Sequence, residues 1–405
     1  MVNKRILYIN ESLNTGSTGH IVEKLGLHAQ ANGDTCMVAH GARYVRPSQL
    51  PHYGFSTKIE EYIHGVISLF GNAHGLGSRF ATKRLIRFIR GWKPDIIHLH
   101  NIHGYYLNYS LLFDYLKEAK IPVVWTLHDC WAFTGRCAYF TLSGCAQWKK
   151  QCSHCPTYSD YPRSVIPWHT SSNFLLKKQA FSGLPSLTIV PVSNWLSGHV
   201  QQSFLRTYPR HTIYNGIDTK LFRPEVSDLR SQWNAEDKVV LLGVASQWTE
   251  TKGWSDWLKL VRSLDNGYCV VMVGVTKSQA NQLPSWCIAI PQTEDIHQLV
   301  QIYSAADVYI NLAHQEAFGL TLLEAMACGT PCISYRTTAI PETTTEDTCI
   351  MVEEGDLNGI IETVQSKGRM LKQERSEICR QHVVAHFNEE NKIEEYENIY
   401  NHHHL

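Results

Sequence analysis

Short runs of apolar residues recur along the chain, and they alternate with longer segments in which apolar residues return every three or four positions. Runs of the first kind are typical of buried strands, and segments of the second kind are typical of helices. In the first half, helical spacing is clear over 21–30 and 78–92. The strands expected there cover 5–9, 35–39, 95–100, 123–128 and 187–192. This alternation predicts a parallel sheet covered by helices.

The alternation begins again after the break at Arg223-Pro224. The second set of expected strands covers 239–245, 269–275, 287–290, 307–312 and 331–335. Stretches such as LTIVPVS and YCVVMVGV are apolar almost throughout, as in strands that are buried on both faces. The expected fold class is therefore α/β, with two doubly wound parallel sheets. We expect an N-terminal domain over 1–214, a second domain over 215–385, and a C-terminal helix and tail over 386–405.

Composition supports the division into two domains, and it argues against a disordered, nucleic-acid-binding, secreted or membrane-spanning protein. A chain of 405 residues suits two domains, and 43% hydrophobic with 18% charged residues is the mix of a folded protein. The formal net charge is zero, so the overall charge gives no reason to expect nucleic acid as a partner. The first residues lack an apolar signal core, and no run reaches the ~18 apolar residues of a membrane span. We expect a cytoplasmic protein.

Open α/β sheets bind ligands in the loops after the carboxyl ends of their strands, so two facing sheets would share a deep interdomain cleft. A turn of small residues, Gly16, Ser17, Thr18 and Gly19, follows the first strand and opens a helix. Backbone N–H groups and the helix dipole favour an anion at such a turn. Its spacing differs from the GxGxxG of dinucleotide-binding proteins. A phosphate loop and a plain helix start therefore both stay open.

The stretch HQEAFGLTLLEAMACGTP, residues 314–331, places two glutamates around the expected start of a helix over 320–328. The N–H groups of Gly319, Leu320 and Thr321 would be unpaired there and would invite a phosphate. Glu316 in the loop and Glu324 inside the helix can each accept hydroxyl groups of a sugar, because a carboxylate offers two acceptor oxygens. The alternative is a pair of solvated charges on an ordinary amphipathic helix.

Histidines lie at the ends of two expected strands. His128 follows a buried strand, where an imidazole can donate or accept a proton near neutral pH, and the alternative is a structural histidine bonded to backbone carbonyls. His98, His100 and His103 resemble a metal triplet. Side chains alternate along a strand, so the first two share one face while His103 lies in the loop beyond. A structural or acceptor-lining role is favoured over a metal.

Glu316 and Glu324 in EAFGLTLLEAMACGTP resemble the E-x7-E signature of the retaining glycosyltransferases of family 4. Further matches follow in order over roughly residues 1–385, and they are the turn at 16–19, WKPDIIHLH, TLHD, Val192-Ser193, NGID and Lys252-Gly253. The resemblance implies two facing Rossmann-like domains of the GT-B type. It also implies transfer of a sugar from a nucleotide-sugar donor to a hydroxyl acceptor, with retention of anomeric configuration.

The resemblance assigns roles to individual residues. Glu316 would contact the donor sugar, Glu324 would bind the ribose, and His128 would hydrogen-bond the donor sugar near the reacting centre. The remaining donor-binding residues lie between the two glutamates and are Phe318, Gly319, Leu320 and Thr321.

One position departs from the family pattern. An arginine usually precedes the lysine of the Lys-Gly pair by five or six residues, and the two cations neutralise the donor diphosphate. Lys252 is present, but Ser246 and Gln247 hold the arginine positions. We expect Lys252 to bind phosphate, with Ser246 as a neutral donor or a cation supplied from elsewhere, because a fixed cation is a large electrostatic contribution. No Asp-x-Asp occurs, so we expect catalysis without a metal or any other cofactor.

Three functions stay open. The first is a retaining glycosyltransferase that extends a saccharide or lipid-linked acceptor of a surface polysaccharide, such as capsule, exopolysaccharide or lipopolysaccharide, because many relatives have that role. Its departing phosphate would take the acceptor proton, and neither glutamate would be a covalent nucleophile, unlike those of retaining glycosidases. The second is a sugar-nucleotide hydrolase or epimerase on the same scaffold. The third, suggested by the missing arginine, is a non-catalytic nucleotide-sugar binding protein.

Four cysteines, Cys137, Cys145, Cys152 and Cys155, follow His128 in a loop with few apolar anchors. A structural zinc can replace a core in such an excursion, and four thiolates suit it. Only the last two cysteines have the usual C-x2-C spacing. A structural zinc and packed free thiols are the two alternatives.

The segment 79–93 is basic and amphipathic. Its apolar side can pack on the sheet, or its cations can dock at the inner membrane surface, in which case a lipid-linked acceptor is favoured. The cations on one side are Arg79, Lys83, Arg87 and Arg90, and the apolar residues on the other are Leu85, Ile86, Ile89 and Trp92.

Overall fold

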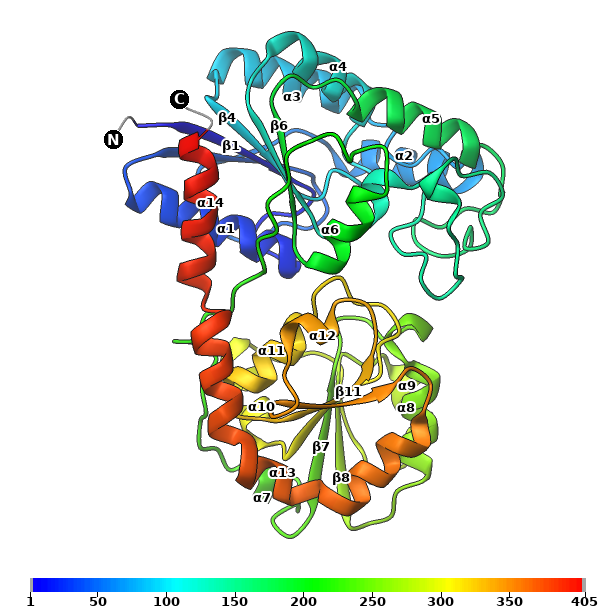
Figure 1. Ribbon diagram of the computed structural model, residues 1–405, viewed down its shortest axis with the longest axis vertical. Helices are drawn as coiled ribbons and strands as arrows, with labels where there is room; N and C mark the ends of the chain where they lie inside the picture. The colour runs from blue at the N-terminus through cyan, green and yellow to red at the C-terminus, as the bar shows by residue number, and fades with distance from the viewer. Residues whose placement is uncertain (1–2, 403–405) are drawn as a thin grey trace. The chain divides into compact units, whose positions relative to one another are not determined.

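The computed structural model describes residues 3–402 and divides the chain into two compact units (Figure 1). The N-terminal unit is Met1–Ile213 together with Ile393–Leu405, and the C-terminal unit is Tyr214–Lys392. Each unit is a parallel sheet of six strands with helices on both faces.

The sheet of the N-terminal unit has the strand order β3-β2-β1-β4-β5-β6. Its central strand β1 pairs on both sides in parallel, so that Leu7 is opposite Met37 on β2 and Ile97 on β4. The strands are β1 (Arg5–Asn10), β2 (Thr35–His40), β3 (His52–Gly54), β4 (Ile96–Leu99), β5 (Val123–Leu127) and β6 (Leu187–Pro191). The order reverses between β1 and β4, and open α/β sheets bind ligands at such a switch point.

Among the described residues, seven α-helices belong wholly or largely to the N-terminal unit. They are α1 (Gly16–Ala31), α2 (Lys58–Gly71), α3 (Arg79–Trp92), α4 (Tyr109–Ala119), α5 (Thr170–Phe181), α6 (Asn194–Gln201) and α14 (Glu389–His402). Helix α14 brings the end of the chain back onto this sheet, beside α1 (Figure 1). There Tyr400 Oη lies 2.6 Å from His98 Nδ1, and Thr126 donates a hydrogen bond of 3.2 Å to Tyr396 Oη.

The sheet of the C-terminal unit has the order β12-β11-β10-β7-β8-β9, which is the same winding as the first. Its strands are β7 (Val239–Val244), β8 (Tyr268–Val273), β9 (Ile288–Ile290), β10 (Val308–Asn311), β11 (Cys332–Arg336) and β12 (Cys349–Glu353). Its helices are α7 (Leu229–Gln232), α8 (Trp254–Arg262), α9 (Lys277–Ala280), α10 (Ile296–Ala305), α11 (Leu320–Ala327), α12 (Ile340–Thr343) and α13 (Leu357–His386), which is kinked at Gly368. The switch point lies between β7 and β10.

All ten strands expected from the sequence are present, and the prediction of two doubly wound parallel sheets is confirmed. The sequence did not predict β3 or β12. Each of them is the outermost strand at one edge of its sheet. An edge strand is covered less than a central one, and β3 has the sequence HYG with two exposed residues, so it lacks an apolar run.

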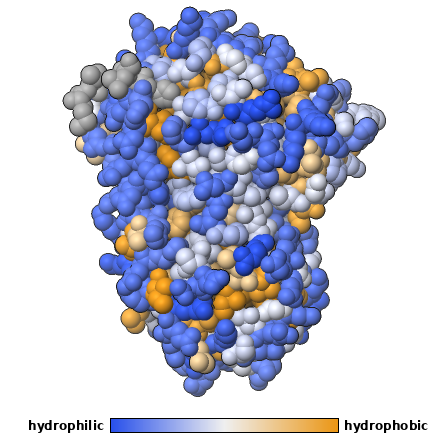
Figure 2. Space-filling view, viewed as in Figure 1, coloured by the Kyte–Doolittle hydropathy of each residue, from blue (hydrophilic) through white to orange (hydrophobic). Residues whose placement is uncertain are grey.

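Most of the surface seen in Figure 2 is hydrophilic, and hydrophobic residues form separate patches on it. The long helix α13 is amphipathic rather than uniformly apolar, and it packs Ile360, Val364 and Leu371 into the core of the C-terminal unit. None of the helices within residues 3–402 is both long and apolar enough to cross a membrane.

Candidate functional site

The start of α11 has no side-chain cap. Strand β10 leads into a loop that ends at Gly319, whose φ of 93° is a left-handed conformation that favours glycine. No side chain caps the helix there, so the first amides of α11 and the positive end of its dipole remain for an anion. Tyr309 on β10 donates a hydrogen bond of 2.8 Å to Thr321 Oγ1, which fixes the first turn of the helix on the sheet.

Lys252 pairs with Glu316, which lies in the loop that leads into this helix. Lys252 ends a 3-10 turn (Glu250–Lys252) after β7, Glu316 lies in the loop after β10, and Nζ is 2.5 Å from Oε1. The lysine side chain is 36% exposed and the glutamate side chain 14% exposed. The switch point of the sheet thus brings together a cation and a carboxylate that are 64 residues apart in sequence.

The two loops that carry Lys252 and Glu316 are in close backbone contact. Gly253 has a φ of 75°, and a Cβ at this position would lie 2.2 Å from the carbonyl oxygen of Leu312. The N–H of His314 donates to the carbonyl of Thr251 at 2.9 Å. Only glycine permits this approach, so the Lys-Gly pair joins a cation to the residue that positions it.

Glu324 lies inside α11 and is held by a tyrosine. Its Oε2 accepts a hydrogen bond of 2.8 Å from Tyr303, which belongs to α10. Burial raises the pKa of Glu324 to about 7, and the bond from Tyr303 offsets part of that increase. A carboxyl group with this pKa changes charge near neutral pH, so its capacity to accept hydrogen bonds depends on pH.

Two other residues of the expected donor site differ in exposure. Phe318 is buried, and its ring packs against Tyr214 and Phe387 with centroids 5.7 and 6.0 Å apart. Its side chain therefore packs the loop onto these two rings. Ser246 and Gln247 are exposed directly after β7, where each can offer a neutral hydrogen bond but no charge.

His128 lies at the end of β5 in the N-terminal unit, beside a second histidine. His128 Nε2 is 3.1 Å from His100 Nδ1, and the two rings stack with centroids 5.4 Å apart. Burial lowers the pKa of His128 to about 4, so its imidazole is neutral near pH 7. His98 is fully buried between Tyr400 and Thr126, which gives it a structural role.

A small pocket at the ends of β4 and β5 is lined by His100, His103, His128 and Asp129. His103 Nε2 lies 2.8 Å from Asp129 Oδ2. Burial acts against charge on both groups, but the attraction between them prevails, so the pKa of His103 is raised and that of Asp129 is lowered. The pocket therefore combines a neutral imidazole with an ion pair.

Glu11 is a candidate that was not expected from the sequence. Glu11 follows β1 directly, and burial raises its pKa to about 7. Gly104 approaches it so closely that a Cβ there would lie 2.5 Å from Glu11 Oε1. Its position after the central strand was the available signal, because β1 and β4 form the switch point of this sheet.

The turn of Gly16, Ser17, Thr18 and Gly19 forms the first turn of α1, and Thr15 before it makes no side-chain cap. A Cβ at Gly19 would lie 2.8 Å from Ser12 Oγ, so this glycine permits the loop after β1 to fold back. Gly16 and Ser17 are exposed. The turn lies at the carboxyl end of β1, on the same edge of the sheet as Glu11.

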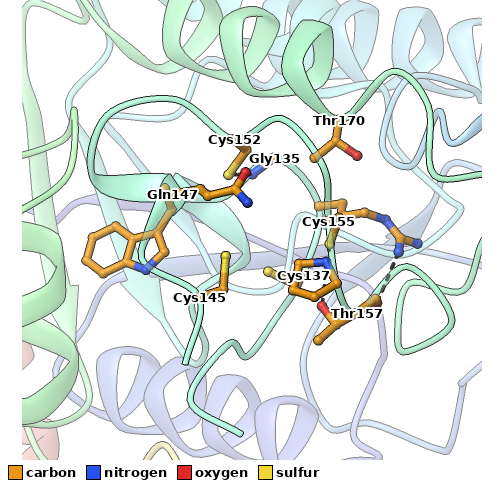
Figure 3. Close-up of a pocket in the computed structure, with 11 residues that line it drawn as sticks. Gly135, Cys137, Cys145, Gln147, Cys152, Cys155, Thr157 and Thr170 are labelled. Carbon is orange, nitrogen blue, oxygen red and sulfur yellow. Dashed lines mark hydrogen bonds between the residues drawn. The ribbon is translucent and has the colours of Figure 1, made fainter. Parts of the chain in front are cut away.

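The four cysteines of the loop after His128 line one small cavity (Figure 3). Cys152 Sγ accepts from the N–H of Gly135 at 3.2 Å, and Cys155 Sγ lies 3.4 Å from Thr157 Oγ1. A hydrogen bond from Cys137 is the main reason why the pKa of Cys155 falls to about 5. Over residues 3–402, no three His, Cys, Asp or Glu side chains are placed to hold a metal ion. The sequence left a structural zinc and packed free thiols open, and within these residues the four cysteines, Cys145 included, line the cavity without being arranged as a metal site.

Two family models match most of the chain. The one described as Glycosyltransferase Family 4 matches residues 21–221, and the one described as Glycosyl transferases group 1 matches residues 226–370. The two matches meet near the boundary between the N-terminal and C-terminal units.

Curated relatives match either a shorter part of the chain or most of it at lower sequence identity. The N-acetyl-alpha-D-glucosaminyl L-malate synthase of Bacillus anthracis is 27% identical over 47% of this chain and 52% of its own length. The putative colanic acid biosynthesis glycosyl transferase WcaC of Escherichia coli K12 is 35% identical over 31% of this chain and 32% of its own. A 41.2 kDa protein in the cps region of Klebsiella pneumoniae is 22% identical over 81% of this chain and 84% of its own. The chain thus spans about half the length of the first relative and a third of the second.

Solved structures with the same fold cover nearly the whole chain. A sucrose-phosphate synthase from Thermosynechococcus elongatus has a TM-score of 0.71 at 16% identity, covering 99% of both chains. HepE of Anabaena in complex with UDP-glucose has a TM-score of 0.67 at 14% identity, covering 98% of this chain and 100% of its own. WaaG, a glycosyltransferase involved in lipopolysaccharide biosynthesis, has a TM-score of 0.64 at 12% identity, covering 97% and 99%.

Proposed function

Because the chain belongs to the group 1 glycosyltransferases of the family 4 type, with the GT-B fold, we propose that it moves a sugar from a nucleotide-sugar donor to a hydroxyl group of an acceptor. The observation that carries the proposal is the Lys252–Glu316 pair, whose glutamate lies in the loop that leads into the uncapped start of α11. A cation, a carboxylate and free amides in one place match the diphosphate and the sugar of such a donor.

The donor diphosphate would bind at the first amides of α11 and at Lys252. In the free protein Lys252 is paired with Glu316, so an arriving phosphate would compete for the lysine. When Lys252 moves from Glu316 to the phosphate, the Glu316 carboxylate would become free to accept hydrogen bonds from hydroxyl groups of the donor sugar. Lys252 would thus stabilise the charge that develops on the leaving diphosphate, which is a large electrostatic contribution.

Glu324 would bind the ribose of the donor. The hydrogen bond from Tyr303 occupies one carboxylate oxygen and fixes the rotamer, so the other oxygen can accept from the ribose. Ser246, directly after β7 and exposed, would add a neutral hydrogen bond to the diphosphate in place of the arginine that family members usually have.

His128 would hydrogen-bond the donor sugar near the reacting carbon. It is neutral near pH 7, so its one N–H can donate a hydrogen bond without adding a positive charge beside an oxocarbenium-like centre. The departing phosphate would take the acceptor proton on the same face, with retention of configuration. No Asp-x-Asp occurs in the chain, so we propose that Lys252 and the helix start replace the metal of metal-dependent transferases.

The acceptor would be a saccharide or a lipid-linked saccharide of a surface polysaccharide. The naming of WcaC for colanic acid biosynthesis and the location of the Klebsiella protein in a cps region support this class. The pocket around His103 and Asp129 in the N-terminal unit, with the turn at Gly16, is where we place acceptor or phosphate contacts.

Incubation with a panel of nucleotide sugars, with and without saccharide acceptors, tests the proposal. Acceptor-dependent release of nucleotide supports a transferase, and NMR of the product reports the anomeric configuration. Turnover without acceptor would instead indicate a hydrolase or epimerase on the same scaffold. Binding without turnover, measured by calorimetry, would indicate a nucleotide-sugar binding protein.

A further inference from the structure

Helix α2 buries its polar side and exposes its apolar side, which is the opposite of an ordinary surface helix. Its buried residues are the polar Glu61, His64 and Ser68. Six large apolar residues on the opposite side are between 39 and 72% exposed. They form what we call the apolar stripe, and they are Ile59, Tyr62, Ile63, Val66, Ile67 and Phe70. A surface helix ordinarily turns such a face toward the core, so the stripe requires another explanation.

Buried hydrogen bonds fix this orientation. The Glu61 carboxylate accepts from the N–H of Ala42 and the hydroxyl of Ser56, both at 2.5 Å. His64 Nε2 accepts from the N–H groups of Gly75 and Gly77, both at 3.1 Å. Turning the helix to bury its apolar side would break these bonds and leave the N–H groups of Ala42, Gly75 and Gly77 without these partners, which costs free energy. The outward position of the apolar side is therefore a stable property of the fold.

The stripe continues onto the segment that packs against the end of α2. The N–H of Val165 donates to the carbonyl of Leu69 at 3.0 Å, and Asn72 donates to the carbonyl of Trp168 at 2.5 Å. Val165 and Trp168 are themselves exposed. Exposed apolar residues therefore lie on both of these bonded segments, unlike single exposed residues, which need no explanation.

Cations border the stripe. Helix α3 lies alongside α2, because Arg84 Nη2 is 2.5 Å from Glu60 Oε2 and Ser78 Oγ is 3.0 Å from His64 Nδ1. The apolar side of α3 packs into the interior of the unit, since Leu85 is fully buried. Its outer side exposes a row of cations, Arg79, Lys83, Arg87 and Arg90, and Lys58 and Arg163 are exposed at the two ends of the stripe.

We propose that the apolar stripe of α2 and the cations of α3 dock the N-terminal unit on an anionic phospholipid surface. Apolar side chains of a surface helix insert at the acyl boundary while neighbouring Lys and Arg contact anionic headgroups. A second copy of the chain suits the surface less well, because a two-fold contact through the stripe would bring the bordering cations of both copies together. The inference rests on the proposed function, and it favours a lipid-linked acceptor over a free saccharide.

Co-sedimentation with vesicles tests the inference. We expect the full chain to bind vesicles of phosphatidylcholine mixed with phosphatidylglycerol and to bind pure phosphatidylcholine much more weakly. Ile63→Ser together with Ile67→Ser should weaken binding to the mixed vesicles by about tenfold or more, because each serine removes an inserted apolar side chain. Lys83→Glu together with Arg87→Glu should weaken it by a similar factor and flatten its salt dependence.

Matched controls separate docking from misfolding and from the catalytic proposal. Ile378→Ser together with Val384→Ser replaces two equally exposed apolar residues on α13 and should leave vesicle binding unchanged. All variants should keep the wild-type melting temperature and the wild-type turnover of a soluble acceptor, since they change exposed side chains only. Failure of the proposed function would abolish turnover and leave vesicle binding intact.

Three results would overturn the inference. One is equal vesicle binding by the wild type and the α2 double variant. Another is equal binding to pure phosphatidylcholine and to the mixed vesicles. The third is a wild-type dimer in light scattering that Ile63→Ser with Ile67→Ser converts to a monomer, which would assign the stripe to a second copy of the chain.

Discussion

The Nζ of Lys252 lies 2.5 Å from Oε1 of Glu316, so the loops after β7 and β10 place a cation directly beside a carboxylate at the switch point of the C-terminal sheet. A partly buried pair of this kind contributes little to folding by itself. We propose instead that the pair serves donor binding. A donor phosphate would take Glu316's place as the partner of Lys252, and Glu316 could then accept hydrogen bonds from sugar hydroxyls.

Lys252→Met is expected to lower kcat by roughly 10²–10³-fold, because it removes the only fixed cation we assign to the diphosphate. The half-exposed lysine has a small role in folding, so the melting temperature should change little. Nucleotide release in steady state measures the effect, and Lys252→Arg, which keeps the charge, should retain more activity. Equal activity of the methionine variant and the wild type would remove Lys252 from the site.

Glu324 should make donor binding depend on pH. Its pKa is raised to about 7 by burial, so the carboxylate that would bind ribose is lost as the pH falls below that value. We expect the donor KM to rise from pH 8 to pH 6 in the wild type and to be high and nearly constant over this range in Glu324→Gln. A wild-type KM that does not vary between these pH values would contradict the ribose role.

The same shift has a consequence for stability. A carboxyl group whose pKa is higher in the folded than in the unfolded state favours folding at low pH, and this contribution is lost as the pH rises through about 7. The melting temperature of Glu324→Gln relative to the wild type should therefore be higher at pH 8 than at pH 5. Calorimetry at the two pH values measures the difference, and the opposite order would contradict the raised pKa.

His128→Ala is expected to lower kcat by about 10²-fold, the size of effect that a positioned hydrogen-bond donor or acceptor has near a reacting centre. His128→Asn keeps a donor and should lose less. Because the pKa of His128 is about 4, its titration should not appear in the rate profile between pH 6 and 8. A rate limb in this range that disappears in His128→Asn would show that the imidazole titrates there.

Gly253→Ala should lower both stability and activity. The added Cβ would lie 2.2 Å from the Leu312 carbonyl at a φ of 75°, so the loop that carries Lys252 has to move. We expect a loss of roughly 1–3 kcal/mol in the free energy of unfolding, measured by denaturant titration. Gly198→Ala is the matched control, since its Cβ meets no atom within 4 Å, and it should be neutral or slightly stabilising.

Chelation should leave turnover unchanged, because the proposed mechanism uses Lys252 and the helix start instead of a metal. Loss of activity in EDTA that Mg²⁺ or Mn²⁺ restores would contradict this. Elemental analysis separately decides between the structural zinc and the packed free thiols that the sequence leaves open at the four cysteines after His128. Zinc in the purified protein, with a lower melting temperature after chelation, would support a structural site, and a metal-free protein would leave four free thiols.

The sequence predicted the central strands because a strand buried on both faces is apolar almost throughout, as β7 and β8 are. It could place Glu316 and Glu324 around a helix start, but it could not show that Lys252 reaches Glu316, because that contact requires the strand order. The raised pKa of Glu11 depends on burial by residues distant in sequence, so its position directly after a strand was the signal that the sequence offered. The sequence did not predict the orientation of helix α2, because hydrogen bonds rather than apolar burial decide which of its sides faces inward.

The central claim is that a donor diphosphate binds at the start of α11. A crystal structure of the protein with a nucleotide sugar that it turns over tests this most directly. We predict phosphate oxygens at hydrogen-bond distance from the N–H groups of Leu320 and Thr321, with Lys252 Nζ turned from Glu316 toward the phosphate. A donor bound elsewhere in the molecule, with the Lys252–Glu316 pair still intact, would contradict the account.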